Sequence, residues 1–110
     1  ELKCGRAADI LKSLPADIEP FDFIFIDADK QSYPEYLELS LNLSHSGTLI
    51  FLDNVIRAGD IINPENHKPS IEGIRDMFKA MQNHPKILSC TALQTVGSKG
   101  HDGFALAIVK

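Results

Sequence analysis

The segment FDFIFIDADK, from Phe21 to Lys30, constrains the fold of this chain more than any other. It is a nearly continuous run of apolar, β-prone residues that ends at two acids and a lysine. Such a run is typical of a strand buried on both faces, as in parallel sheets covered by helices. We therefore predict that Phe21–Ile26 is a strand in the middle of a parallel sheet. Open α/β sheets bind ligands beyond the carboxyl ends of their strands, so Asp27, Asp29 and Lys30 are predicted to lie at the functional edge.

A second apolar run repeats this pattern. Thr48–Leu52 is followed by Asp53 and Asn54, and a segment with helical features, Tyr33–Leu43, lies between the two runs. Strand, helix and strand at this spacing form a right-handed βαβ unit, whose strands are parallel and are expected to be adjacent. Adjacent strands lie about 4.8 Å apart. Asp27 and Asp53 are therefore expected to reach the same edge and to share one ligand.

Two further helices and a long loop are predicted from local patterns. Apolar residues at helical spacing predict a short helix over Gly5–Leu14 and another that follows an N-cap at Ser70 and ends before Pro85. Residues 55–70 are predicted to be a loop. A long loop at the functional edge of a sheet is usually a binding element or a mobile lid.

The carboxy-terminal part of the chain predicts an antiparallel hairpin. The β-prone runs Ile87–Val96 and Phe104–Val109 are separated by the glycine-rich connection GSKGHDG. With 110 residues and 44% hydrophobic content, the chain is long enough for one domain and too short for two. We predict a single α/β domain over residues 1–110, with helices on both faces of a parallel sheet and this hairpin at the carboxyl end.

The net charge indicates which kinds of partner the chain can bind, and the cysteine content indicates its cellular compartment. A formal net charge of -4 without a Lys/Arg cluster argues against a nucleic-acid or anionic-membrane surface, which leaves small molecules or proteins as partners. Cys4 and Cys90 stand alone, which predicts buried or free thiols in a reducing compartment, so we expect a cytoplasmic protein. No apolar stretch reaches the length of a membrane span or a signal peptide. Because the first residue is Glu1, we expect the natural amino terminus to lie upstream.

Three oxygen donors follow the two predicted strands. Asp27, Asp53 and Asn54 are the kind of ligand that Mg²⁺ and Ca²⁺ prefer, and an incomplete set leaves positions for substrate and water. The alternative is structural: the two acids accept backbone hydrogen bonds where strands turn into loops, and Asn54 is a turn residue. The repetition of the pattern on two strands favours the metal site.

Lys30 is a candidate general base, because it lies three residues after Asp27 and because a neighbouring divalent cation would ease the loss of its proton. The alternative is an ordinary solvated lysine. Asp29 either orients Lys30 or starts a helix. No GxSxG turn, Walker loop or GxGxxG motif is present. The four histidines have no metal-ligand spacing and are expected at the surface; they are His45, His67, His84 and His101.

Three segments together resemble a known family. FDFIFIDADKQSY, GTLIFLDNVIRAGDI and ALQTVGSKGHDGFALAIVK resemble the carboxy-terminal half of the bacterial cation-dependent O-methyltransferases related to caffeoyl-CoA and catechol O-methyltransferases. The resemblance covers nearly the whole chain. It implies a partial Rossmann-like class I methyltransferase fold that lacks the N-terminal cofactor-binding strands. It also implies transfer of a methyl group from S-adenosylmethionine to a small catechol-like hydroxyl, with the help of a divalent cation.

The resemblance also implies roles for individual residues. Asp27, Asp53 and Asn54 correspond to the family's metal ligands, and Lys30 corresponds to its base. Ala7 lies in a segment similar to the one that contacts the adenine of S-adenosylmethionine, so Ala7 and Asp27 are expected to contact the cofactor. The family's glycine-rich turn and its second-strand acid lie upstream of this chain, so we expect residues 1–110 alone to be inactive.

Two departures from the family pattern limit what the resemblance implies. Arg57 and Ala58 stand where plant relatives carry substrate-contacting residues, so the identity of the acceptor does not transfer. In the family's sheet, the strand matching Phe21–Ile26 has a neighbour that this chain does not contain. That edge is expected to recruit other strands, which predicts a homo-oligomer such as a dimer, or to be filled by a displaced segment of the chain.

Two other functions remain open from the residues alone. A phosphatase of the haloacid dehalogenase type would use Asp27 as nucleophile and Asp29 as general acid beside Mg²⁺. That motif normally continues to Thr or Val where this chain has Gln31, and no later Asp-Asp pair follows. The second alternative is a catalytically silent αβ binding or assembly module whose acids are structural.

Overall fold

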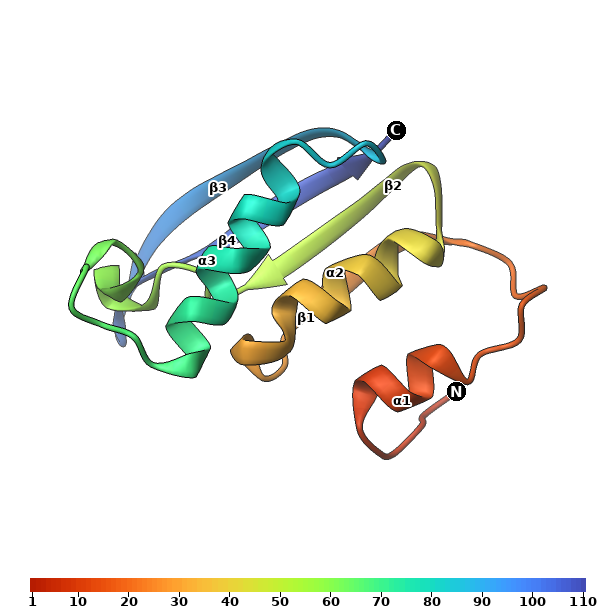
Figure 1. The fold of residues 1–110 in the computed structure, drawn as a ribbon, viewed down its shortest axis with the longest axis horizontal. Coiled ribbons are helices and arrows are strands. Elements are labelled where there is room, and N and C mark those ends of the chain that lie inside the picture. Colours follow the sequence, from red (N-terminus) through yellow and green to blue (C-terminus); the bar gives the residue numbers. More distant parts are fainter.

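A four-stranded mixed sheet carries the fold of the structure, a computed structural model that describes residues 1–110 (Figure 1). The β1 and β2 strands are parallel, whereas β4 is antiparallel to both β2 and β3. In the order β1-β2-β4-β3, the strands are β1 (Phe21–Ile26), β2 (Ser44–Asp53), β4 (Gly100–Val109) and β3 (Ile87–Gly97). The predicted βαβ unit and the predicted hairpin are both confirmed.

Three α-helices and two 3-10 helices precede or connect the strands. The boundaries predicted for two of the helices are wrong. The helix expected over Gly5–Leu14 is shorter, and Ser70 lies inside α3 because Pro69, whose missing N–H costs nothing in the first turn, already begins that helix after Lys68. The helices are α1 (Ala7–Lys12), η1 (Lys30–Ser32), α2 (Tyr33–Asn42), η2 (Arg57–Ile62) and α3 (Pro69–Gln82).

The strands β2 and β4 are longer than their apolar runs. The β2 strand begins at Ser44, which pairs with Phe21 across an irregularity in the register. In the hairpin, Gly97 pairs with Gly100, so most of the predicted glycine-rich connection belongs to β4. Gly100 has a φ of 94°, which a side chain would disfavour, and this conformation allows the tight turn.

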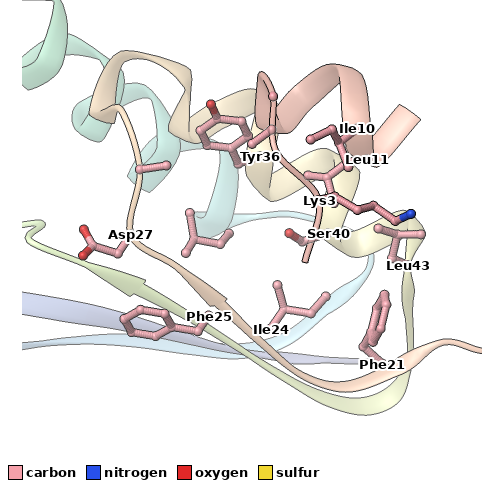
Figure 2. A pocket seen from close by; sticks show the side chains of 14 residues that line it. Lys3, Ile10, Leu11, Phe21, Ile24, Phe25, Asp27, Tyr36, Ser40 and Leu43 are labelled. Carbon is pink, nitrogen blue, oxygen red and sulfur yellow. The ribbon is translucent and has the colours of Figure 1, made fainter. Parts of the chain in front are cut away.

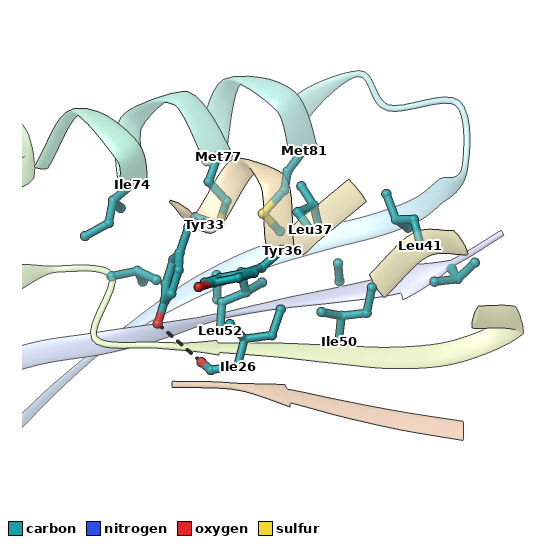
Figure 3. Packing of buried hydrophobic residues seen from close by; sticks show 14 of the residues in the cluster. Ile26, Tyr33, Tyr36, Leu37, Leu41, Ile50, Leu52, Ile74, Met77 and Met81 are labelled. Atoms are coloured by element: carbon teal, nitrogen blue, oxygen red, sulfur yellow. Dashed lines mark hydrogen bonds between the residues drawn. The ribbon is translucent and has the colours of Figure 1, made fainter. Parts of the chain in front are cut away.

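The hydrophobic core lies between the sheet and the helices α2 and α3 (Figure 3), and Ala8 of α1 also belongs to it. Alternate residues of β2 and β4 point into it, and α2 and α3 lie over the same face of the sheet (Figure 1). The fully buried members include Leu37 of α2, Ile74 and Met77 of α3, Ile50 of β2 and Ala107 of β4. The α/β class is confirmed, but helices on both faces were expected, and within residues 1–110 they cover one face only.

The opposite face of the sheet is apolar and exposed. Phe25 lies 5.2 Å from Phe51 between ring centroids, and Phe51 stacks on Phe104 at 4.6 Å. The side chains of Phe23 and Phe25 are 53% and 55% exposed, and β1 lies at the edge of the sheet. The prediction that Phe21–Ile26 is buried on both faces in the middle of the sheet is therefore wrong for these residues, whereas the unpaired edge is confirmed.

No helix of the structure has both the length and the apolar character that crossing a membrane would require. The two cysteines, Cys4 and Cys90, are free and exposed, so of the buried or free thiols expected from the sequence neither is buried.

Candidate active site

The carboxyl ends of β1 and β2 bring the predicted acids together. Ile26 pairs with Leu52 in the parallel register, so the residues that follow them, Asp27 and Asp53, lie at the same end of neighbouring strands. The Tyr33 hydroxyl of α2 joins the two ends: it lies 2.7 Å from the carbonyl oxygen of Asp53 and 3.3 Å from that of Ile26 (Figure 3). The sequence missed this link, because Tyr33 was expected only to start a helix.

Lys30 is buried beside Asp27. Its side chain is 9% exposed, and its Nζ lies 2.9 Å from Asp27 Oδ1 and 4.8 Å from the centroid of the Tyr33 ring. Burial acts to lower the pKa of Lys30, but Tyr33 and Asp27 raise it by more, so its pKa lies above the ordinary value. The alternative of a solvated lysine is wrong. In this arrangement Lys30 is an ammonium group paired with a half-exposed carboxylate.

Asn54 stands at the turn after β2 in a left-handed conformation, with a φ of 58°. Its backbone N–H donates to Asp53 Oδ1 at 2.7 Å, and its side-chain Nδ2 donates to Asp102 Oδ2 at 3.2 Å. The first of these bonds agrees with the structural alternative for Asp53, a carboxylate that accepts a backbone hydrogen bond at a strand end.

Asp102 was not among the predicted site residues. Burial would raise the pKa of Asp102, but hydrogen bonds from the backbone of Arg57 and Gly103, and from the Asn54 amide, hold it below its usual value. Asp102 therefore stays ionised at neutral pH. The sequence marked it only as part of a glycine-rich connection, and no local pattern links it to Asn54.

Asp27, Asp53 and Asn54 are the residues expected to bind a divalent cation. The structure contains no group of three or more His, Cys, Asp or Glu that could hold a metal. The expected set has only two carboxylates and one amide, all hard oxygen donors from the same end of the sheet. In chemistry and placement these residues fit Mg²⁺ or Ca²⁺, provided that Asp27 can exchange Lys30 for the cation.

An apolar cavity of about 330 Å³ lies between α1, β1 and α2 (Figure 2). Ala7 and Ile10 of α1 line it, together with Ile24 of β1 and Tyr36 of α2. Asp27 also lines this cavity, so the structure brings Ala7 and Asp27, the two expected cofactor contacts, to the same space.

A second, polar cavity of about 520 Å³ adjoins the same strand end. Lys30, Asn54 and Arg57 line it, and Ala28 lines both cavities. The segment that follows β1 therefore separates an apolar space from a polar one, with Asp27 on the first and Lys30 on the second.

Asp29 holds the turn that carries Lys30. Its Oδ1 accepts a hydrogen bond of 2.5 Å from the Tyr36 hydroxyl of α2. The sequence left open whether Asp29 orients Lys30 or starts a helix. It precedes the 3-10 helix that begins at Lys30, and its carboxylate binds α2.

The segment expected to be a loop over residues 55–70 contains η2 and is held to α3. The Arg75 guanidinium donates to four of its carbonyl oxygens, at 2.6 to 3.3 Å, in Asp60, Ile61, Asn63 and Asn66. Each of these bonds joins a charged donor to a backbone acceptor, which makes them stronger than neutral hydrogen bonds. Arg75 therefore ties this segment to α3, which favours the binding element over the mobile lid of the two roles expected from the sequence.

Comparison with known proteins finds relatives that align with the whole of this chain. The chain is 47% identical over 111 residues to a catechol O-methyltransferase of Niastella koreensis and 42% identical over 110 residues to one of Mycobacterium tuberculosis. Both alignments cover 100% of this chain, which spans about half of each relative (50% and 48%). The crystal structure of an O-methyltransferase from Bacillus cereus in complex with SAH superposes with a TM-score of 0.94 and 50% identity, over 100% of this chain and 50% of that one.

The family model described as O-methyltransferase matches residues 1–107. The resemblance carried by the strand-end motifs is thus confirmed over almost the whole length. The family model matches almost the whole chain, and both relatives align with all of it. The chain therefore belongs to the O-methyltransferase family.

Proposed function

We propose that this chain is the carboxy-terminal part of an O-methyltransferase domain that uses S-adenosylmethionine and a divalent cation to methylate a small catechol-like hydroxyl. The observation that carries the proposal is the paired end of β1 and β2, where Asp27 and Asp53 follow neighbouring strands and Lys30 pairs with Asp27. Asp27 lines an apolar cavity there and Lys30 a polar one. Relatives named catechol O-methyltransferases support the acceptor class, and the SAH complex of a similar structure supports the donor. Family membership leaves the phosphatase alternative without support. We also propose a cytoplasmic location, in keeping with the free thiols.

The apolar cavity is our candidate for part of the donor site. S-adenosylmethionine carries its methyl group on a positively charged sulfur, and the transfer needs an ionised acceptor oxygen in line with the carbon–sulfur bond. In this proposal Ala7 contacts the adenine, because it lines the apolar cavity, and Asp27 lies at the charged end of the same cavity. The half-exposed Asp27 carboxylate offers negative charge where the donor is positive.

The polar cavity is our candidate for the acceptor site. Asp27, Asp53 and Asn54 would hold Mg²⁺ or Ca²⁺ at its edge. A cation bound there would lower the pKa of an acceptor hydroxyl and fix its position. Lys30 would take the hydroxyl proton, for which it must first be neutral. Its ion pair with Asp27 opposes that, so Lys30 can act as a base only when Asp27 has another positive partner.

The first test measures divalent binding and methyl transfer together. In the polypeptide at its full natural length, Asp53→Ala is expected to abolish Mg²⁺ binding by calorimetry and methyl transfer from S-adenosylmethionine to a catechol. The reason is the loss of one of only two carboxylate ligands. Removal of divalent cations with a chelator is expected to have the same effect on transfer.

The matched control is Asp76→Ala, which removes an exposed acid of α3 paired with Lys79 and is expected to change neither measurement. A wild-type protein that binds no divalent cation and transfers no methyl group would instead support the silent binding module. Residues 1–110 alone are expected to show no transfer, and micromolar donor binding by this isolated chain would contradict that expectation.

We further propose that residues 1–110 self-associate through the β1 edge, because that strand offers an unpaired backbone and exposed phenylalanines. Sedimentation velocity of the isolated chain is expected to show concentration-dependent association, and Phe25→Lys is expected to weaken it. The control is Ile62→Lys, since Ile62 is also exposed but lies in η2 away from the edge. A monodisperse monomer at high concentration would rule out this association.

A further inference from the structure

Asp102, near the start of β4, accepts hydrogen bonds from four donors of two separate segments. Its Oδ1 lies 2.9 Å from the backbone nitrogen of Gly103, 3.1 Å from that of Arg57 and 3.3 Å from that of Ile56. Its Oδ2 accepts the remaining bond, from Asn54 Nδ2 at 3.2 Å. One carboxylate therefore holds both the backbone and the side chain of the turn after β2.

This turn needs such support. Three of its non-glycine residues have positive φ angles, Asn54 at 58°, Arg57 at 54° and Ala58 at 55°, a region that side chains disfavour. Conformations of this kind persist only where the surroundings fix them, and they concentrate at functional sites.

The backbone of β4 comes very close to the turn. A Cβ on Gly103 would lie 2.4 Å from Ile56 Cγ1 and 2.3 Å from the carbonyl oxygen of Leu93, so only glycine fits there. The Gly103 carbonyl also accepts a hydrogen bond from the backbone nitrogen of Val55 at 3.0 Å. The backbone next to Asp102 therefore packs directly against the turn after β2.

The bond to Nδ2 decides which end of the Asn54 amide is available. A side-chain amide has a donor end and an acceptor end that are nearly equal in shape, so its orientation is set by its partners. Because Nδ2 donates to Asp102 Oδ2 at 3.2 Å, the donor end of the amide faces Asp102, which leaves Asn54 Oδ1 for another partner. Only that oxygen can bind a cation.

We propose that Asp102 is a positioning residue that turns Asn54 Oδ1, and not Nδ2, toward the strand ends of Asp27 and Asp53. This inference rests on the proposed metal-dependent function. It assigns a role to a residue of β4 that does not itself touch the cation. Partners that orient metal ligands in this way commonly change metal affinity 10- to 100-fold when they are altered.

The test exchanges the two side chains. In Asp102→Asn, the new amide oxygen can still accept the three backbone N–H groups, but its NH₂ group then faces Asn54 Nδ2. Two donors repel, so the Asn54 amide is expected to rotate and to direct its own NH₂ toward the cation. Calorimetry with Mg²⁺ on the full-length polypeptide is expected to show about 10- to 100-fold weaker binding, with the circular dichroism spectrum unchanged.

The double variant Asn54→Asp with Asp102→Asn restores an acceptor facing a donor. One oxygen of the new carboxylate accepts a hydrogen bond from the amide and the other faces the cation, so Mg²⁺ affinity is expected to return at least to the wild-type value, since the site also gains a negative charge. A residue that only stabilised the turn would change the melting temperature without this reciprocal rescue. The Asn54 side-chain ¹⁵N resonance provides a readout without metal, because its hydrogen bond to a carboxylate is lost in the single variant.

The outcomes separate the two proposals. Wild-type Mg²⁺ binding that Asp102→Asn leaves unchanged, or that the double variant fails to restore, would overturn the role of Asp102 alone. A wild-type protein that does not bind Mg²⁺ would overturn the metal-dependent function, and the role of Asp102 in it as well.

Discussion

Lys30→Met is expected to lower the rate constant of methyl transfer by about 10²- to 10⁴-fold in the full-length polypeptide, the range typical of a lost general base. Methionine keeps the length and the apolar volume of a side chain that is 9% exposed, so the packing against Tyr33 is retained. The Asp27 carboxylate that loses its partner is 51% exposed and can be hydrated, so the fold should survive. The measurement is the single-turnover rate with saturating donor and acceptor.

Lys30→Arg separates proton transfer from charge. Arginine keeps a positive partner for Asp27 but does not lose its proton at accessible pH, so it is expected to be as slow as the methionine variant. Lys79→Met is the matched control, because Lys79 forms an ion pair of the same spacing with Asp76 on the exposed side of α3. An arginine variant with the wild-type rate would exclude Lys30 as the base and leave it an electrostatic role.

Gly73→Ala is expected to destabilise the protein although it places a better helix former inside α3. A Cβ at this position would lie 2.3 Å from the carbonyl oxygen of Lys30 and 2.5 Å from Gln31 Cα. Both neighbours are backbone atoms, so α3 or η1 must move. Overpacking of this kind costs about 3 kcal/mol, and the gain in helix propensity is about 1 kcal/mol, so a net loss of about 2 kcal/mol is expected.

In the full-length polypeptide this loss should lower the melting temperature by about 4–8 °C, because the relatives are about twice as long as this chain and the shift per kcal/mol falls with size. Because the displaced backbone belongs to Lys30, the rate of methyl transfer should fall as well, even below the melting transition. Gly97→Ala is the control, since nothing lies within 4 Å of its Cβ and its φ is outside the left-handed region. A Gly73→Ala variant more stable than wild type would show that α3 and η1 are not in direct contact.

Much of the architecture could be predicted because its signals are local. The apolar runs Phe21–Ile26 and Thr48–Leu52 are strands, and the segment between them is a helix. Two strands joined through a helix run parallel, which places Asp27 and Asp53 at the same end of neighbouring strands, and the register confirms this. No knowledge of distant contacts was needed for that result.

The errors in the prediction lie where a local pattern has two solutions. Ser70 has the chemistry of an N-cap, but Pro69 can begin the helix one residue earlier. The connection GSKGHDG has the composition of a loop, yet most of it pairs with β3 because two residues are enough for the turn. An apolar run such as Phe21–Ile26 has the same pattern whether one or both faces are covered.

The sequence by itself determined which segments become helices and strands and which end of the sheet carries the acids, because hydrophobic periodicity and strand connection rules act over short distances. Only the tertiary structure decided that Lys30 is buried against Asp27, that α3 comes close enough to require Gly73, and that Asp102 holds Asn54 from 48 residues away. The requirement for Gly73 and the burial of Lys30 depend on α3 packing beside η1, and the contact of Asp102 with Asn54 depends on β4 pairing with β2. Such contacts arise when the whole core assembles, and no pattern of neighbouring residues encodes them.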